Sequence, residues 1–155
     1  MPNTTELKTF FEDVINHINE AIMDELATIG EECDTRIRQR GWDESWIDRT
    51  GNLRSSIGYG VYDHGKLAIW SLFDQVRQGS LGSTEGNQMV QALAKEYSDV
   101  VALVVVAAMD YADKVEALEN KDVLESTRIW AMQSVEDRLK QRLDDALEEI
   151  NKWQL

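Results

Sequence analysis

Residues 98–126, SDVVALVVVAAMDYADKVEALENKDVLES, hold the longest uninterrupted apolar run of this 155-residue chain. The run itself, VVALVVVAA from Val100 to Ala108, is rich in β-branched residues and has the length of a single β-strand. Both alternating faces of this strand are apolar, whereas a strand with one face in water would alternate between apolar and polar residues. The sequence therefore predicts a buried, central strand over residues 98–109.

The chain changes character directly after this strand. Asp110 and Tyr111 end the apolar run, and the next residues have spacings that suit one or two helical turns. Asp122 and Glu125 stand three residues apart, which is the spacing of a capping box. They predict the start of a C-terminal helix over residues 122–153. One side of that helix carries Leu124, Thr127, Ala131, Val135, Leu139, Leu143, Ala146, Ile150 and Trp153.

A second long helix is predicted at the other end of the chain, over residues 1–40. Asn3 and Glu6 form a capping pair at its start. Gly30 is expected to bend or interrupt this helix, and Gly41 to end it. Apolar residues recur at intervals of three and four, as on the buried face of an amphipathic helix. They are Leu7, Phe10, Phe11, Val14, Ile15, Ile18, Ile22, Leu26 and Ile29.

Between the two helices, residues 50–73 predict a turn and a hairpin. Thr50 to Asn52 form the turn, and Leu53 to Ile57 form a short helical turn. The apolar period then changes toward two, and residues 63–65, Asp-His-Gly, lie at the middle of two antiparallel strands. Trp42 and Trp46, with Ile47, are interpreted as a cap on the core, with a binding face as the alternative.

Residues 74–97 predict a flexible loop followed by a short helix. Gly79, Gly82 and Gly86 lie among serine, threonine, glutamine and asparagine, which is typical of a loop up to about residue 88. The functional role of this glycine-rich loop is open. Residues 89–97 are predicted to be helical.

These elements together predict an α+β fold in a single domain spanning residues 1–155. An antiparallel sheet of about three to four strands packs against the long N-terminal and C-terminal helices. A chain of 155 residues with 43% apolar residues is long enough for one well-filled core and too short for two ordinary domains.

The formal net charge of −13 is unevenly distributed. Residues 1–34 contain one lysine and nine acidic residues, whereas residues 35–82 contain seven basic and five acidic residues. This balance argues against tight binding of duplex DNA, which requires a basic face. The local basic cluster of Arg36, Arg38, Arg40, Arg49 and Arg54 is interpreted as a solvated turn or as partners for the acidic helix.

The sequence predicts no catalytic, cofactor-binding or metal-binding residues, and hence no enzyme. It contains no HExxH, CxxC, GxSxG, Walker or calcium-loop motif. Cys33 is the only cysteine, which excludes an intrachain disulfide. His17 lies beside the apolar stripe and His64 lies in a turn, so no histidine pair is expected. No apolar run approaches the roughly 20 residues that span a bilayer, and the chain is expected to act away from membranes.

Three short motifs in order resemble a family of tailed-phage and prophage neck, or minor tail-component, proteins. The matching residues are Thr50, Gly51, Leu53, Arg54 and Ser56 of a TGxLRxS element; Tyr111, Ala112, Val115 and Glu116 of a YAxxVE element; and Asp122, Val123 and Leu124 of a short motif that opens the last helix. Order and spacing match over roughly residues 45–130.

The resemblance implies a non-enzymatic structural protein of the head-to-tail junction or the tail end. Such a protein forms a homo-oligomeric ring with other head or tail proteins as partners, in the bacterial cytoplasm during assembly and then in the virion. It also implies that Arg54 and Glu116 lie close together as a partly buried pair. The acidic residues Glu12, Asp13, Glu20, Asp24 and Glu31 are then expected either to line the ring's channel and repel DNA, or simply to keep the protein soluble.

A second function remains open from the residues alone. The alternative is a host-encoded binding or regulatory module whose acidic helices recognise a basic protein partner.

Overall fold

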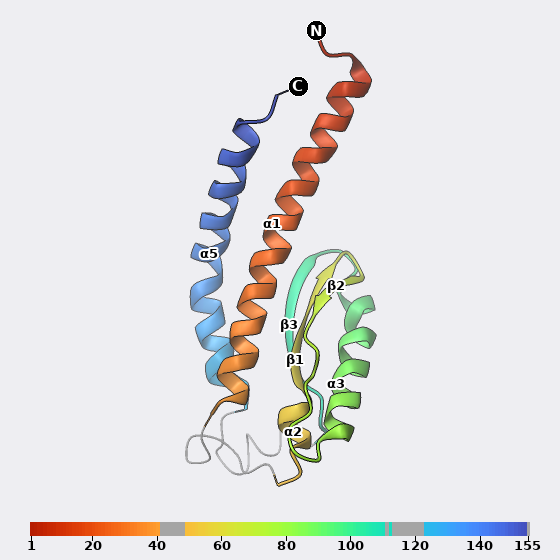
Figure 1. Cartoon of the computed structure of the whole chain (residues 1–155), viewed down its shortest axis with the longest axis vertical. Coiled ribbons are helices and arrows are strands. Elements are labelled where there is room, and N and C mark those ends of the chain that lie inside the picture. Colours follow the sequence, from red (N-terminus) through yellow and green to blue (C-terminus); the bar gives the residue numbers. More distant parts are fainter. Residues whose placement is uncertain (41–48, 111, 113–122, 155) are drawn as a thin grey trace.

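The computed structural model describes residues 1–40, 49–110, 112 and 123–154. The elements within them run in the order α1 (Thr4–Arg38), α2 (Asn52–Ser55), β1 (Ile57–Asp63), β2 (Lys66–Trp70), α3 (Ser80–Ala92), the 3-10 helix η1 (Leu93–Tyr97), β3 (Val101–Ala107) and α5 (Glu125–Asn151). Figure 1 shows these elements along the long axis of the molecule. The predicted α+β class is confirmed, with three strands in the described part of the chain.

The sheet is antiparallel and has the strand order β2-β1-β3. The central strand is therefore β1, and the prediction that residues 98–109 form the central strand is wrong. β3 lies at an edge of the sheet, and six of its seven residues are only partly buried. By contrast, six of the seven residues of β1 are fully buried.

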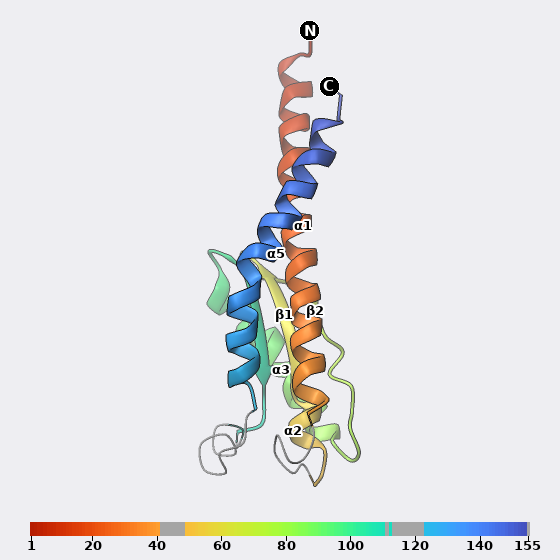
Figure 2. The same ribbon diagram turned by 90° about the vertical axis from the view of Figure 1, so that its left-hand side faces the viewer.

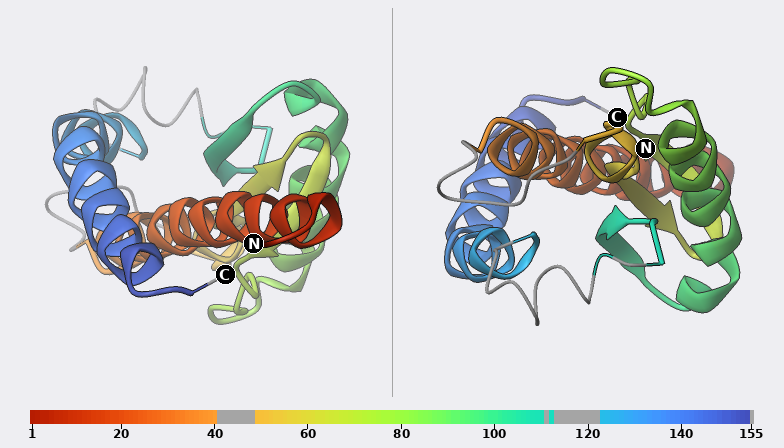
Figure 3. Two further views of the ribbon diagram at one scale, coloured as in Figure 1. Left: turned by 90° about the horizontal axis from the view of Figure 1, so that it is seen from above. Right: turned by 90° about the horizontal axis from the view of Figure 1, so that it is seen from below.

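Helices cover both faces of the sheet, which explains why an edge strand can be apolar on both sides. Leu26 of α1 packs with Tyr59 and Val61 of β1 on one face, and Leu103 and Val105 of β3 join them. A second cluster on the opposite face contains Tyr62, Phe73, Val90 and Val106. Figure 3 shows α1 and α5 on one side of the sheet and α3 on the other.

Helix α1 is continuous and begins with the predicted capping box. Asn3 Oδ1 accepts from Glu6 N at 2.9 Å, and Glu6 Oε2 accepts from Asn3 N at 2.9 Å. Gly30 does not interrupt the helix, because it lies within the unbroken span of α1. The helix ends at Arg38, before Gly41, with Gln39 as its C-cap residue.

The loop prediction for residues 74–88 holds only as far as Gly79. Ser80–Ala92 forms helix α3, which continues into η1. Gly82 and Gly86 are buried. A Cβ atom at Gly82 would overlap the backbone of Asn52, and a Cβ atom at Gly86 would overlap the ring of Phe73. Here glycine allows α3 to approach α2 and the sheet closely, so these residues promote packing instead of a loop.

Helix α5 begins at Glu125, three residues later than predicted, and Leu124 at its N-cap makes no side-chain capping bond. Asp122 of the predicted capping box lies outside the described residues. So do Trp42, Trp46 and Ile47, together with Tyr111, Val115 and Glu116.

Helices α1 and α5 form an antiparallel pair that extends beyond the sheet. The 35 residues of α1 correspond to a length of about 52 Å, whereas a strand of 7 residues covers about 23 Å. Residues 4–21 of α1 and 142–151 of α5 therefore project past the strands, and we call this pair of segments the arm. Figures 1 and 2 show both ends of the chain at the tip of the arm.

Candidate functional site

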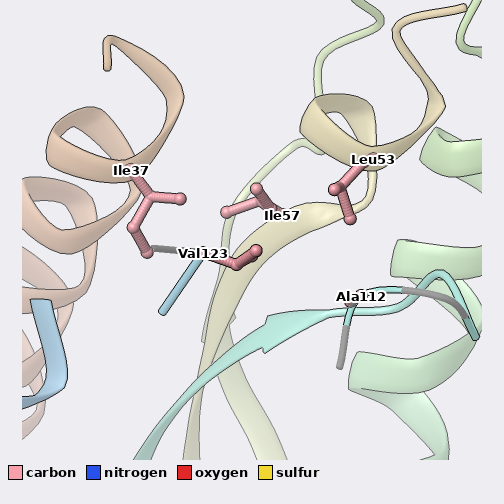
Figure 4. Packing of buried hydrophobic residues seen from close by; sticks show 5 residues of the cluster. All are labelled: Ile37, Leu53, Ile57, Ala112 and Val123. Atoms are coloured by element: carbon pink, nitrogen blue, oxygen red, sulfur yellow. The ribbon is translucent and has the colours of Figure 1, made fainter. Parts of the chain in front are cut away.

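Opposite the arm, a buried apolar cluster joins the ends of several elements, and we call this region the base. The cluster contains Ile37, Leu53, Ile57, Ala112 and Val123 (Figure 4). Leu53 belongs to the TGxLRxS element, Ala112 to the YAxxVE element and Val123 to the motif before the last helix. The structure thus brings together one residue from each of the three motifs that carry the family resemblance.

The TGNLRSS segment forms a tight turn that anchors the chain around it. Gly51 has a φ of +82°, which a side chain would strain, and its carbonyl accepts from Ser55 N at 2.9 Å. Ser55 Oγ accepts from Val76 N at 2.7 Å, and Asn52 Oδ1 accepts from Gly82 N at 3.1 Å. This segment therefore holds both the loop after β2 and the first turn of α3.

Three arginines of the predicted basic cluster bind polar groups of the base. Arg54, 8% exposed, donates to the carbonyls of Arg38 at 2.6 Å and Arg40 at 3.0 Å. Arg38 donates to the carbonyl of Ile57 at 3.2 Å and to that of Asp74. These contacts fasten the end of α1 to α2 and to the sheet.

Arg40 extends the same network to α5. It donates to the hydroxyls of Ser126 and Thr127 at 2.6 Å each and to the carbonyl of Val123 at 3.4 Å. Arg36 stacks over the ring of Trp130 on α5, 4.4 Å from its centroid. The contacts of Arg36, Arg38, Arg40 and Arg54 give the basic cluster a structural role, and the predicted pairing of Arg54 with Glu116 involves a residue outside the described part.

Ion pairs join α1 to α5 next to the arm. Arg138 Nε donates to Glu25 Oε1 at 2.8 Å, and Arg138 Nη2 donates to Glu32 Oε1 at 3.0 Å. His17 Nε2 lies 2.8 Å from Glu149 Oε2. Some acidic residues of α1 therefore have basic partners on α5, a pairing that the charge count did not predict.

The arm itself buries little apolar surface. Ala21 and Ala146 are its only fully buried residues. Beside them, Trp153 just after α5 makes edge-to-face ring contacts with Phe10 and His17 of α1. Phe11 is 60% exposed and Ile15 is 57% exposed, and Leu7 and Leu147 are also exposed. Leu7, Phe11 and Ile15 are spaced four residues apart, which places them on one stripe of α1. The arm therefore presents an uncovered apolar stripe.

The five acidic residues that were predicted as a polar face all lie exposed on α1. They are Glu12, Asp13, Glu20, Asp24 and Glu31. Asp24 lies 3.9 Å from Arg142 Nη2 of α5, and Glu12 lies 3.9 Å from Lys8 Nζ. The acidic face is thus real, and it lies on the same helix as the apolar stripe.

Burial raises the pKa values of several titratable groups near the sheet. Loss of solvation is the main cause for Asp34, whose pKa rises to about 6 even though Arg38 lies nearby, and for Cys33, whose pKa rises to about 11. It also raises the pKa of Tyr62 to about 12, and the Tyr62 hydroxyl donates to the Val90 carbonyl at 2.6 Å. Burial in the core is thus the common cause of these raised pKa values.

Within the described ranges, no group of three or more His, Cys, Asp or Glu side chains is placed to hold a metal ion. No helix in the same ranges combines the length and the apolar character needed to cross a bilayer. An apolar groove of about 330 Å³ lies between β3 and α5, and Cys33, Leu103 and Met132 are among its lining residues.

Comparison of the chain with protein-family models, curated proteins and solved structures found no match.

Proposed function

We propose that this chain is a non-enzymatic structural protein of a phage or prophage head-to-tail junction or tail end, which assembles with itself and with other virion proteins. The observation that supports this function most is the meeting of Leu53, Ala112 and Val123 in the base. These residues come from three motifs far apart in the sequence, and a family fold built on these motifs would bring them into one cluster as found here.

The arm is consistent with a subunit of a larger assembly. The arm leaves Phe11, Ile15 and Leu147 largely exposed, and Ala21 and Ala146 are the residues that it buries fully. Clustered apolar exposure of this kind marks surfaces that another protein covers. A neighbouring virion subunit is the partner that the proposed function provides.

The exposed carboxylates fit a position at the channel of a ring. A channel that passes DNA must not retain it, and carboxylates repel phosphates, whereas a basic lining would bind them through counterion release. In the proposed ring, Glu12, Asp13 and Glu20 point toward the axis. The isolated protein should show no measurable affinity for duplex DNA at low salt. If the acidic face of α1 lies on the outer rim of an assembled ring, the lining role is contradicted.

The decisive experiment is to search for the protein in purified particles. Induced lysates should yield particles that contain this chain by mass spectrometry, with antibody label at the head-to-tail junction or tail end. Deletion of its coding sequence should leave heads and tails unjoined or tails incomplete. Its absence from particles, together with normal particle yield after deletion, would refute the proposal. Portal, capsid and tail-tube genes beside its own would support it.

The second candidate, a host acidic module that binds a basic protein, is favoured by one observation. The arm combines exposed carboxylates with the apolar stripe of Leu7, Phe11 and Ile15 on a single helix. This candidate predicts that a cationic amphipathic helical peptide binds the chain and that Phe11→Ser together with Ile15→Ser abolishes binding. Lack of binding at low salt would exclude this candidate.

A further inference from the structure

The two edges of the sheet differ in how they are protected from pairing with another strand. The β2 edge has five residues, carries Lys66 and contains a register irregularity opposite Val61 and Tyr62. Short strands, edge lysines and bulges are devices that prevent edge-to-edge association. The β3 edge has seven residues, VALVVVA, without charge, proline or irregularity. Only the β2 edge is therefore protected.

The hydrogen-bond pattern identifies the backbone groups that β3 leaves unpaired. His64 N donates to Val100 O at 3.0 Å, and Ala108 N donates to Ser56 O at 3.3 Å, so the even-numbered residues of β3 direct their backbone groups toward β1. The odd-numbered residues direct theirs outward; these are Val101, Leu103, Val105 and Ala107. Nothing in the described part of the chain bonds to these outward groups. They are a ready-made template for another strand.

An apolar rim surrounds this free edge. The groove between β3 and α5 has a volume of about 330 Å³ and is lined by Leu103, Val105 and Met132, among others. Met132, which lines the groove, is 65% exposed, and Val100 at the start of the edge is 48% exposed. Figure 3 shows β3 as the strand nearest to α5, at the end of the sheet. A strand added to β3 would bury this rim as well as satisfy the backbone groups.

We propose that the β3 edge pairs with the β3 edge of a second copy of this chain, antiparallel and about a two-fold axis at Val104. The two sheets then form one continuous sheet of six strands, three from each copy. A two-fold contact closes a dimer and is distinct from the head-to-tail contacts that close a ring, so this inference goes beyond the proposed function. It does not depend on the phage assignment.

Self-complementarity of the strand favours a second copy over a different partner. In this register Val101 lies opposite Ala107, and Leu103 lies opposite Val105, so that every outward donor of one strand meets an outward acceptor of the other. A large residue faces a small one at Val101 with Ala107, and again at Ala102 with Val106. Such pairs fit side by side on a pleated surface.

Charge favours the same contact. Each chain carries a formal net charge of −13, and two copies repel each other over most of their surfaces. β3 carries no charged residue, so like charges do not face each other across the paired strands. A two-fold contact uses the same patch on both subunits, which is the commonest arrangement in homo-oligomers. The β3 edge meets these requirements without a contribution from another protein.

A cysteine at the two-fold axis tests the register directly. Val104 of one copy lies opposite Val104 of the other in a non-hydrogen-bonded pair, where Cα atoms are about 4.5 Å apart and a disulfide fits. In a Cys33→Ala background, Val104→Cys should therefore give a covalent dimer under mild oxidation. Ala102→Cys alone is the matched control, because its two copies would be about 13 Å apart.

Mixing two variants provides a test that does not depend on Val104. Ala102→Cys and Val106→Cys, each inert alone in the same background, should cross-link when mixed. Cross-linking of Val104→Cys to Trp70→Cys instead would show pairing of β3 with β2 and overturn the two-fold arrangement. An oligomer in which neither the Val104 variant nor the mixture cross-links would overturn the use of the β3 edge.

A change at the rim tests the interface without disturbing the strand. Met132 is 65% exposed, so Met132→Glu should leave the fold intact, as judged by circular dichroism. It should weaken dimerisation in sedimentation equilibrium by at least about tenfold, which corresponds to about 1.4 kcal/mol. Leu72→Glu is the control, because Leu72 is 80% exposed and follows the β2 strand. It should leave dimerisation unchanged.

The results separate this inference from the proposed function. A protein that stays monomeric at about 100 μM, a concentration well above the Kd of a typical specific dimer, refutes β3 pairing even if the chain is found in phage particles. A β3-linked dimer that is absent from particles supports the pairing and refutes the phage role.

Discussion

Gly30 of α1 lies directly against the ring of Tyr59 on β1: a Cβ atom at position 30 would be 2.6 Å from Tyr59 Cδ2 and 2.9 Å from Leu103 Cδ1. The helix therefore approaches the sheet most closely where it has no side chain. This contact sets the distance between α1 and the central strand.

Gly30→Ala should destabilise the protein even though alanine is the better helix former by about 1 kcal/mol. Overpacking of a tight contact typically costs about 1–3 kcal/mol, which outweighs the gain in helix propensity. Urea unfolding measures the difference in unfolding free energy between the variant and the parent. Thr28→Ala on the exposed side of the same helix is the control and should change stability little. A Gly30→Ala protein more stable than the parent would show that the contact relaxes without cost.

Asp34→Asn should stabilise the protein at neutral pH. The folded-state pKa of Asp34, about 6, lies above the usual value of 3.8 because the carboxyl is buried. The folded state thus binds this proton more tightly than the unfolded state, and the resulting stabilisation is complete below about pH 4 and is lost as the pH rises through 6. An amide does not become charged, so the gain at pH 7 should be about 3 kcal/mol.

The measurement for Asp34→Asn is the difference in unfolding free energy between variant and parent from pH 4 to pH 7.5. The other carboxylates cancel in this difference. The difference should grow as the pH rises. A constant difference over this range would contradict the assigned burial of Asp34.

Cys33 should be unreactive in the folded protein. Its side chain is 1% exposed, and burial raises its pKa to about 11, so very little reactive thiolate forms at pH 8. An aromatic disulfide reagent should react slowly with native protein and completely in denaturant. Thr28→Cys in a Cys33→Ala background, with the thiol on the exposed side of α1, should react at once. Equally fast labelling of native Cys33 would mean that the groove beside it opens readily.

Arg54→Ala should destabilise the base by about 2–4 kcal/mol. The guanidinium of Arg54 donates to two backbone carbonyls at the end of α1, and its removal leaves these buried acceptors without their donor. Arg54→Lys should recover only part of the loss, because an ammonium cannot reproduce the planar fork. Arg49→Ala, at an exposed position, is the control. Changes of a few tenths of a kcal/mol for Arg54→Ala would refute the structural role.

Glu116→Ala tests the pairing that the family resemblance implies between Glu116 and Arg54. If the pair is partly buried, loss of the carboxylate should also cost several kcal/mol. A double variant that costs no more than the more severe single variant would indicate direct coupling. Full additivity of the two changes would exclude it.

Arg138→Ala should weaken the contact between α1 and α5. Arg138 lies between Glu25 and Glu32 and is 28% exposed, and its removal leaves two carboxylates close together. A loss of about 1–2 kcal/mol is expected, and it should shrink as salt is added. Lys140→Ala removes an exposed pair with Glu136 and should have little effect. An equal effect of both substitutions would contradict the assignment.

Local patterns in the sequence were sufficient to predict the fold class, both long helices and the hairpin. The capping box of Asn3 and Glu6 fixed the start of α1 almost to the residue, because capping depends only on neighbours. The position of β3 in the sheet could not be predicted in this way. Apolar residues on both faces of a strand indicate that a layer covers each face of the sheet. Here α1 and α3 are these layers, and the strand that they cover lies at the edge.

Tertiary contacts explain the remaining errors. Gly82 and Gly86 were interpreted as loop residues, yet their lack of a side chain lets α3 pack against Asn52 and Phe73. The roles of Arg38, Arg40 and Arg54 depend on carbonyls supplied by distant elements, which no spacing in the sequence reveals. The clearest available signal for the α1–α5 ion pairs was the i, i+4 spacing of Arg138 and Arg142 on an acidic helix.

The arginines of the base bind carbonyl and hydroxyl groups, which carry no charge. The arm has two fully buried alanines between its helices, and the ion pair of His17 with Glu149 is partly exposed to solvent. Added salt should therefore separate the helix tips while the base stays closed. Amide hydrogen exchange would show this as protection lost first near both chain ends and last around Ile37 and Leu53. The molecule should therefore open at the tip of the arm, with the arginines of the base as the hinge.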